Sequence, residues 1–465
     1  MKSFAPTACA LALAAAFPAA AQSNEELLKE LRALRDRVQQ LEQKLQAAPA
    51  APAPGQWGMT PEQAREMNRL AVKAESMQDN FADQGYKGLK IGGYIEPVFL
   101  WNKRQDRAGF QFLNEDGYFY DTSYMGAAVL DLTKETESGT LWRLVLSPNR
   151  GVGSYIGGSI VQEATVSVPL GDLQTRLIAG QIPDWSGYEY QQPTLNPFTT
   201  HNLLYDFTLP TAYTGVGLDI TRGKWWLRAA IGNLNANKRQ AGEKSPVLAY
   251  RVDYSKGEFD GWGFAGVHGK TTNFNLCRDA ACETFLGTRT DLFEIDGYYI
   301  RGDWTLQGQL AFGSQKQAAI QPDANGEFRD SSWTGVSGLV GYSITPRLQA
   351  LLRADYIKND KNGGGLFGYT GYWDAFGVDG PYGDYRNGIG PDPTLGCEDP
   401  TVEACSKGAN RYALTLGLKY LLNENTTLKA EWRMDGANLP MFYDVKSGGW
   451  RKTNQLLGAS MVVAW

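Results

Sequence analysis

Histidine and cysteine are scarce in this sequence, which has two histidines, His201 and His268, and five cysteines among its 465 residues. Imidazole and thiolate groups carry much of the chemistry of metal centres and of nucleophilic catalysis. His201 has no serine or aspartate at a spacing typical of a hydrolase. We therefore expect no enzyme activity, no metal ion and no cofactor.

Long apolar runs are also missing, because no stretch of 18 or more apolar residues occurs, and this argues against a transmembrane helix. The mean hydropathy is only −0.36, although aromatic residues make up 12% of the chain and glycines number 53. This combination fits a transmembrane β-barrel, whose strands are apolar on one face only. A net charge of −5 without a basic tract argues against nucleic acid as a partner.

The N-terminus predicts export and then a stalk. Lys2, an apolar core at 8–17 and three alanines at 19–21 are typical of a signal peptide over residues 1–21. Residues 22–46 repeat leucine or valine at heptad spacing, which predicts a coiled coil. A Pro/Ala-rich linker follows at 47–58, and Thr60-Pro61 opens a helical segment within 59–86. That helix could plug the barrel or act as a spacer, and we favour the spacer.

The coiled coil is expected to form a homotrimer. Residues 37–42 resemble the Arg-h-x-x-h-Glu pattern of trimeric coiled coils, in which h is apolar and the Arg pairs with a Glu of a neighbouring chain. Valine at position a with leucine at d leans towards dimers, and a surface amphipathic helix is the alternative. The predicted trimerisation residues are Leu31, Leu34, Arg37, Val38, Leu41 and Glu42.

From residue 87 to 465 the apolar period becomes two, which predicts an all-β chain of about sixteen antiparallel strands. The expected strands are 87–102, 123–134, 138–148, 160–170, 173–181, 212–221, 224–234, 247–256, 260–270, 289–300, 303–313, 333–344, 347–358, 410–422, 426–434 and 454–465. The connections between them alternate short and long, as in outer-membrane barrels. The last strand ends on Trp465, which resembles the C-terminal signal of bacterial barrel proteins. We therefore expect the bacterial outer membrane as the location, with its lipid as a partner.

Register assigns a charged inner face to these strands, because an arginine that faces the bilayer midplane costs about 2–4 kcal/mol. Charges on this face would either shape the field of a pore or form salt bridges that only stiffen the wall. The predicted pore wall consists of Arg143, Arg176, Arg228, Arg251, Arg353 and Arg411. Acidic residues and further basic residues are predicted on the same face: Asp131, Glu163, Asp253, Glu294, Asp296, Asp355, Lys429, Glu431 and Arg433.

Two pairs of cysteines lie in two long connections. Four cysteines allow three pairings, and we favour the local ones, Cys277–Cys282 and Cys397–Cys405, because an exported protein favours disulfides.

The segment 180–216 is long, aromatic and rich in proline. Its motifs are Gly180-Gln181-Ile182-Pro183, Gly187-Tyr188-Glu189, Asn196-Pro197, Leu203-Leu204-Tyr205 and, after Pro210, Tyr213-Thr214-Gly215-Val216. They resemble the OmpL-like putative β-barrel porin family, although Tyr213 stands where that family often has histidine. The N-terminal rod and linker resemble those of trimeric sugar- and phosphate-specific porins.

By strand count this segment is the third long loop, which in trimeric porins folds inward to narrow the channel. We expect its acidic residues to face the arginine wall; a loop packed over the mouth or between subunits is the alternative. The expected constriction residues are Asp184, Trp185, Tyr188, Glu189, Tyr190, His201 and Asp206.

These expectations describe an outer-membrane porin that passes small hydrophilic solutes, such as sugars, small anions or carboxylates, by passive diffusion. The alternative is a structural outer-membrane protein whose stalk contacts the cell wall and whose barrel is occluded.

Overall fold

The computed structural model describes residues 35, 37, 39, 65–73 and 76 and most of 86–465. The gaps in the second range are 113–125, 155–156, 211, 235–245, 258, 278–284, 320–321, 324, 364–390 and 396–402. The chain divides into two compact units, Met1–Ala82 and Asp83–Trp465. Among the described residues, no helix is long and apolar enough to cross a membrane.

In the first unit, residues 65–73 are helical, inside the segment where a helix is predicted. Arg37 is also helical. The other predicted trimerisation residues, the signal peptide and the linker lie outside the described residues, so the coiled coil stays a prediction.

The second unit contains a strand at each of the sixteen predicted places. The first strand is divided at Glu96 and Pro97 into β1 (Leu89–Ile95) and β2 (Val98–Asn102). The other fifteen are β4 (Ala128–Glu135), β5 (Leu141–Ser154), β6 (Gly157–Pro169), β7 (Thr175–Pro183), β8 (Ala212–Arg222), β9 (Trp225–Leu234), β10 (Val247–Ser255), β11 (Asp260–Cys277), β12 (Phe285–Arg301), β13 (Trp304–Gln315), β14 (Ser331–Thr345), β15 (Leu348–Lys361), β16 (Arg411–Asn423), β17 (Thr426–Ala437) and β20 (Thr453–Ala464).

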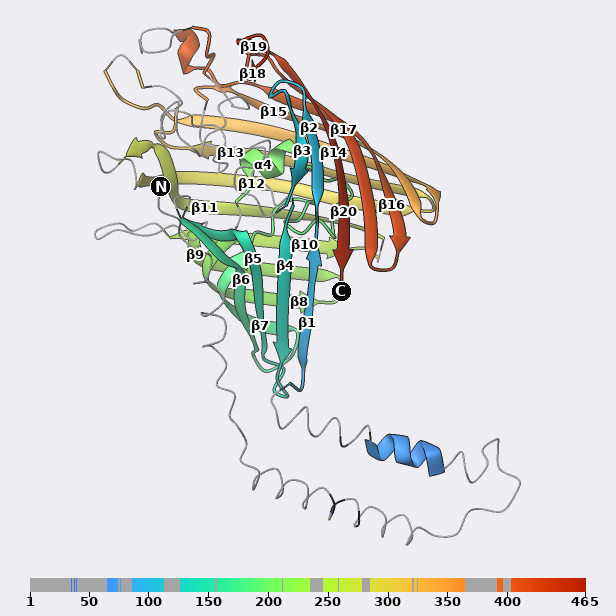
Figure 1. Cartoon of the computed structure of the whole chain (residues 1–465). Helices are drawn as coiled ribbons and strands as arrows, with labels where there is room; N and C mark the ends of the chain where they lie inside the picture. The colour runs from blue at the N-terminus through green and yellow to red at the C-terminus, as the bar shows by residue number, and fades with distance from the viewer. Residues whose placement is uncertain are drawn as a thin grey trace, which may run out of the picture. The chain divides into compact units, whose positions relative to one another are not determined.

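These strands form a closed antiparallel barrel of 16 strands. Each strand pairs with its neighbours along the chain, and β20 closes the ring against the first strand (Figure 1). The closing seam pairs Tyr94 with Ala464 in β1 and Val98 with Ser460 in β2. Closure therefore leaves no free sheet edge along this seam. A free edge would expose unpaired backbone groups, which are costly in an apolar environment.

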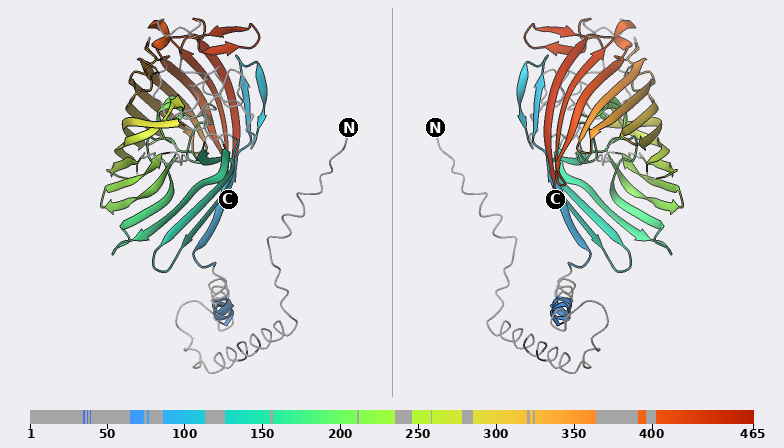
Figure 2. Two further views of the ribbon diagram at one scale, coloured as in Figure 1. Left: turned by 90° about the vertical axis from the view of Figure 1, so that its left-hand side faces the viewer. Right: turned by 90° about the vertical axis from the view of Figure 1, so that its right-hand side faces the viewer.

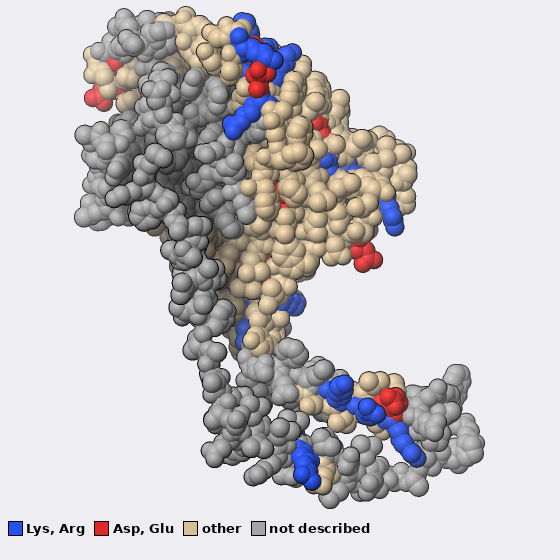
Figure 3. All heavy atoms as spheres, viewed as in Figure 1, with Lys and Arg blue, Asp and Glu red and all other residues tan. Residues whose placement is uncertain are grey.

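Strand alternation separates a charged inside from an apolar outside. In β15, Leu352 and Tyr356 are exposed whereas Arg353 and Asp355 are buried between them. Lys, Arg, Asp and Glu are accordingly sparse on the barrel wall in Figure 3. Exposed apolar residues of this outer face include Leu218, Ile231, Ile295, Leu306, Leu310, Val336, Leu352, Leu416, Leu457 and Met461.

Aromatic residues gather on the outer face near the short turns. Trp225 packs against Tyr254 and Trp262, with ring centroids 4.8 Å and 6.1 Å apart, and Trp304 packs against Tyr342 at 4.8 Å. All five rings lie within three residues of a strand end at the same end of the barrel. Such a band is typical of a membrane interface.

The connections follow the predicted alternation with two exceptions. In the predicted long connection 271–288, β11 extends to Cys277 and β12 begins at Phe285, so most of it is strand. Residues 149–159, predicted as a long connection, are mostly strand, because β5 and β6 continue their pairing as far as Ser154 and Gly157. The pairing register of β5 and β6 shifts three times between Val145 and Ser154. These shifts break the strict alternation by which strands are predicted from the sequence.

Five further elements were not predicted: β3 (Arg107–Gln111), β18 (Phe442–Asp444), β19 (Gly449–Arg451), the 3-10 helix η3 (Glu403–Ser406) and a short helix, α4 (Leu203–Thr208). The β2–β3 and β18–β19 hairpins lie at the same end of the barrel (Figure 2). An ion pair joins them, with Arg104 Nη1 2.7 Å from Asp444 Oδ2.

A charge on the apolar outer face should destabilise the barrel in proportion to its depth. Leu310→Arg, in the middle of β13, should lower the free energy of unfolding by about 2–4 kcal/mol, whereas Ile344→Arg at the short-turn end of β14 should cost about 0–1 kcal/mol. Denaturant titration in lipid vesicles measures both values. Equal losses at the two positions would contradict the assignment of this face to lipid.

Candidate functional site

The connection from β7 to β8, residues 184–211, folds into the barrel. Most of its described residues are buried, including Trp185, Phe198 and Phe207. Its short helix α4 (Leu203–Thr208) lies within the ring of strands (Figure 1) and contacts β13, β14, β15 and β16. Asn202 caps this helix by accepting a hydrogen bond from the amide of Tyr205 at 2.7 Å. We call residues 184–211 the inward loop.

Arg353 of β15 is the main anchor of the inward loop. Its Nη1 lies 2.8 Å from Oε1 of Glu189 and 2.8 Å from the carbonyl oxygen of Thr200, and its Nη2 donates to the carbonyl oxygen of His201 at 2.8 Å. The guanidinium also lies 4.8 Å from the ring centroid of Phe198. The Arg353 side chain is fully buried, so these partners replace its hydration.

Three charged side chains of β17 bind the same part of the loop. Glu431 accepts hydrogen bonds from the amides of Thr199 at 2.8 Å and Thr200 at 3.2 Å. The Lys429 ammonium donates to the carbonyl oxygens of residues 193 and 198, at 2.6 and 3.2 Å. Arg433 Nη1 donates to the carbonyl oxygen of His201 at 2.6 Å. These side chains satisfy backbone groups that a buried irregular segment cannot pair with itself.

Two glycines allow the loop to lie this close to the wall. Gly187 has φ +77°, a left-handed conformation that residues with a Cβ atom rarely adopt. At Gly417 of β16, a Cβ atom would lie 2.6 Å from the Phe198 ring. At Gly417 the Phe198 ring therefore packs directly against the backbone of the wall.

The remaining loop residues make local contacts. Asp184 accepts hydrogen bonds from the amide and hydroxyl of Ser186, both at 3.0 Å, and from the Tyr213 hydroxyl. Tyr188 and Ser337 share a hydroxyl contact of 2.6 Å. We expected Asp184 to face the arginines of the wall. In the structure these hydrogen bonds join it instead to the loop and to β8.

An aromatic cluster stiffens the middle of the loop. His201 stacks on Tyr205 with ring centroids 4.1 Å apart, and its Nε2 lies 2.8 Å from the carbonyl oxygen of Tyr190. Asp206 is buried in α4, whereas 54% of Tyr190 is exposed. Of the expected constriction residues, Tyr190 is thus the one whose ring is open to solvent.

The six predicted wall arginines fall into three groups. Arg251, Arg353 and Arg411 are buried, and Arg251 donates to the carbonyl oxygen of Trp185 at 2.7 Å. Arg176 lies near a short turn, where it donates to the hydroxyl of Ser167 at 2.6 Å. Only Arg143 and Arg228 line the cavity described next.

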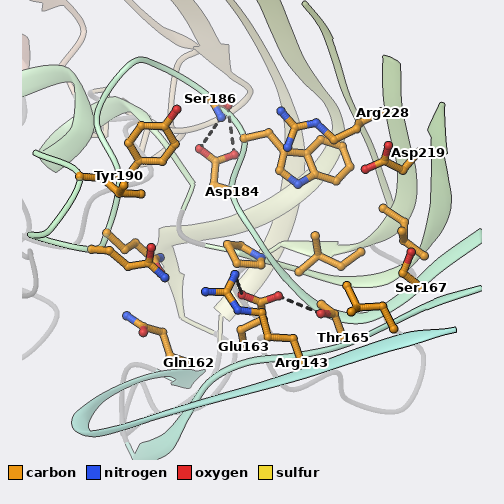
Figure 4. Close-up of a pocket in the computed structure, with 18 of the residues that line it drawn as sticks. Arg143, Gln162, Glu163, Thr165, Ser167, Asp184, Ser186, Tyr190, Asp219 and Arg228 are labelled. Carbon is orange, nitrogen blue, oxygen red and sulfur yellow. Dashed lines mark hydrogen bonds and ion pairs between the residues drawn. The ribbon is translucent and has the colours of Figure 1, made fainter. Parts of the chain in front are cut away.

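A cavity of about 560 Å³ remains between the first part of the inward loop and strands β5 to β9. Figure 4 shows its three sides: Asp184, Ser186 and Tyr190 of the loop; Asp219 and Arg228 of β8 and β9; and Arg143, Gln162, Glu163 and Thr165 of β5 and β6. On the opposite side of the barrel, the inward loop itself contacts β15 and β17. The loop therefore divides the interior into a packed side and an open side.

Both arginines of the cavity lie next to carboxylates. Arg143 Nη2 is 2.6 Å from Asp131 Oδ2, and its Nη1 is 3.2 Å from Glu163 Oε2. The Arg228 guanidinium lies 3.9 Å from the ring centroid of Trp226 and 5.3 Å from that of Trp185. Arg228 Nη2 is also 3.4 Å from Asp253. Neither arginine presents an isolated positive charge.

Sequence reasoning missed Gln162, Asp219 and Trp226 as cavity residues. Asp219 and Trp226 each lie between two apolar residues in β8 and β9. This alternation could have predicted that both side chains face the interior. Gln162 could not be found in this way, because a register shift between Leu146 and its neighbour Val145 places both Gln162 and Glu163 on the inside.

The cysteine pairings stay predictions. Cys277 ends β11 and Cys405 is buried in η3, but Cys282 and Cys397 lie outside the described residues. Within the described part of the chain, no group of three or more His, Cys, Asp or Glu side chains is placed to hold a metal ion.

Several solved barrels are similar to this chain. They include the anion-selective porin from Comamonas acidovorans, at 11% identity and a TM-score of 0.49 over 81% of this chain and 99% of that one. OmpF of Salmonella typhi in complex with daunomycin has 10% identity and a TM-score of 0.49 over 81% and 97%. OprB of Pseudomonas putida has 10% identity and a TM-score of 0.48 over 84% and 96%. These likenesses are too distant to bear on function, and no curated protein matches the chain.

The closed sixteen-stranded barrel and its apolar outer face define a β-barrel protein of the bacterial outer membrane. The chain belongs to the DUF3138 family, described as a protein of unknown function, which matches residues 58–465. This match does not confirm the resemblance to the OmpL-like family.

Removal of the main anchor should destabilise the protein strongly. Arg353→Ala leaves the buried carboxylates of Glu189 and Asp355 without their partner, so the free energy of unfolding should fall by about 3–5 kcal/mol. Arg222→Ala is the matched control, because Arg222 pairs with Asp172 at 3.1 Å while both side chains are half exposed; its loss should cost about 0–1 kcal/mol. Denaturant titration in detergent measures both, and equal losses would contradict the anchoring role.

Proposed function

We propose that this protein is an outer-membrane porin, a water-filled channel through which small hydrophilic solutes diffuse passively. The observation that carries the proposal is the cavity of about 560 Å³ beside the inward loop, inside a closed barrel. Its walls hold charged and amide side chains from four strands, β5, β6, β8 and β9, and from the loop. Such groups are costly to bury in a dry space, so the cavity is expected to be wet.

The rival function is a structural protein whose barrel is occluded and whose stalk contacts the cell wall. An occluded barrel would need an interior that is packed throughout, as it is where the inward loop contacts β15 and β17. The side chains of Arg143 and Asp131 are partly exposed, at 32% and 28%, and this exposure favours an open path instead.

A homotrimer is part of the proposal and rests on the heptad pattern of residues 22–46. In a trimer each subunit would carry its own channel, and conductance would then appear in groups of three equal steps.

The cavity charges should set the ion selectivity of the channel. We expect Glu163→Gln to shift the permeability ratio towards anions and Arg228→Gln to shift it towards cations, each by roughly two- to five-fold, since one charge at short range in water contributes about 1 kcal/mol. Glu137→Gln is the control, because Glu137 lies in a short turn with 82% of its side chain exposed, and it should leave the ratio unchanged.

Planar-bilayer recording of the folded, purified protein tests the proposal. Absence of defined conductance steps would overturn the channel function. If conductance steps occur but neither cavity variant changes their ion selectivity, the protein is a channel whose path does not include this cavity. Steps that arrive singly would count against the trimer alone.

A further inference from the structure

We propose that the cavity binds neutral polyhydroxylated solutes of the carbohydrate class in preference to anions or cations. This inference rests on the proposed function, since it names the solutes that the channel would select.

Gln162 is the first observation behind this inference. Only 2% of the residue is exposed, it lines the cavity, and neither its amide oxygen nor its amide nitrogen has a hydrogen-bond partner among the described residues. The register shift between β5 and β6 turns this side chain inward next to Glu163. An amide offers one acceptor and two donors. A buried amide without a partner is costly, and a solute hydroxyl that reached it would recover part of that cost.

The arrangement of charge is the second observation. Arg143 lies between Asp131 and Glu163, at 2.6 Å and 3.2 Å, and Asp219 accepts a hydrogen bond from Trp226 Nε1 at 2.6 Å. An anion drawn to either cavity arginine would meet these carboxylates, and a cation drawn to the carboxylates would meet the arginines. A hydroxyl group can donate to a carboxylate and accept from a guanidinium at once, so it suits interleaved charges better than an ion does.

Aromatic surface is the third observation. Tyr190 on the loop and Trp226 on β9 are 54% and 41% exposed, and both line the cavity. Rings of this kind combine an apolar face with a polar tip, and an apolar face can pack on the C–H face of a sugar ring. The volume of about 560 Å³ falls within the roughly 300–1,000 Å³ of small-molecule sites.

The test compares three solutes of similar size that differ in charge: glucose, gluconate and glucosamine. Channel current in planar bilayers should fall saturably with glucose, and at least about fivefold higher concentrations of gluconate or glucosamine should be needed for the same block. Gln162→Leu should raise the glucose concentration for half-maximal block about tenfold, and Tyr190→Ala should also raise it. Gln307→Leu, on the inner face of β13 but outside the cavity, should leave it unchanged.

Isothermal titration calorimetry of the detergent-folded protein with the same three solutes gives a readout independent of conductance. Glucose binding that Gln162→Leu weakens supports the inference even if no conductance is found, in which case only the channel function fails. Equal binding or block by all three solutes, or binding by gluconate alone, would overturn the inference while leaving a conducting channel intact. Loss of glucose binding in the Gln307→Leu control would overturn it as well.

Discussion

The buried guanidinium of Arg353 is the interaction on which the interior of this barrel depends. It joins a strand of the wall to three points of the inward loop, at Glu189, Thr200 and His201, all within 2.8 Å. Lys429, Glu431 and Arg433 reinforce it from β17. Because all four bind one side of the loop, the loop lies against β15 to β17 and leaves the space beside β5 to β9 open. The position of the cavity is therefore a consequence of where the anchoring charges stand.

These buried charges are tolerated because the barrel separates two environments. Residues that alternate with Arg353 and Asp355 along β15 face outward and are apolar. A charge on that outer face would meet lipid, whereas on the inner face it finds backbone groups, carboxylates or water. Of the wall arginines, Arg251 and Arg353 bind the loop, whereas Arg143 and Arg228 line the cavity.

Much of the fold could be predicted from the sequence, because alternation with a period of two is a local signal. Residues 304–312 show it plainly, and β13 follows at Trp304–Gln315. The strand count then identified the third long connection as a candidate for an inward loop. The partners within the site could not be predicted, because Arg353 and Glu189 are 164 residues apart. Gln162 could not be assigned an inward direction either, since a bulge breaks the alternation at that point. The hairpin of β18 and β19 has strands of only 3 residues each, too short to show a period.

The central claim is that solutes pass between the inward loop and β5 to β9, and not on the side where the loop is anchored. Cysteine labelling with a charged methanethiosulfonate reagent, followed by mass spectrometry and conductance, tests this claim directly. Thr165→Cys lies in the cavity, whereas Thr415→Cys lies on β16 at a residue with no exposed surface. We expect Thr165→Cys to be labelled and to lose conductance, while Thr415→Cys and the unsubstituted protein are unchanged. Full conductance after labelling at 165, or labelling and block at 415, would contradict it.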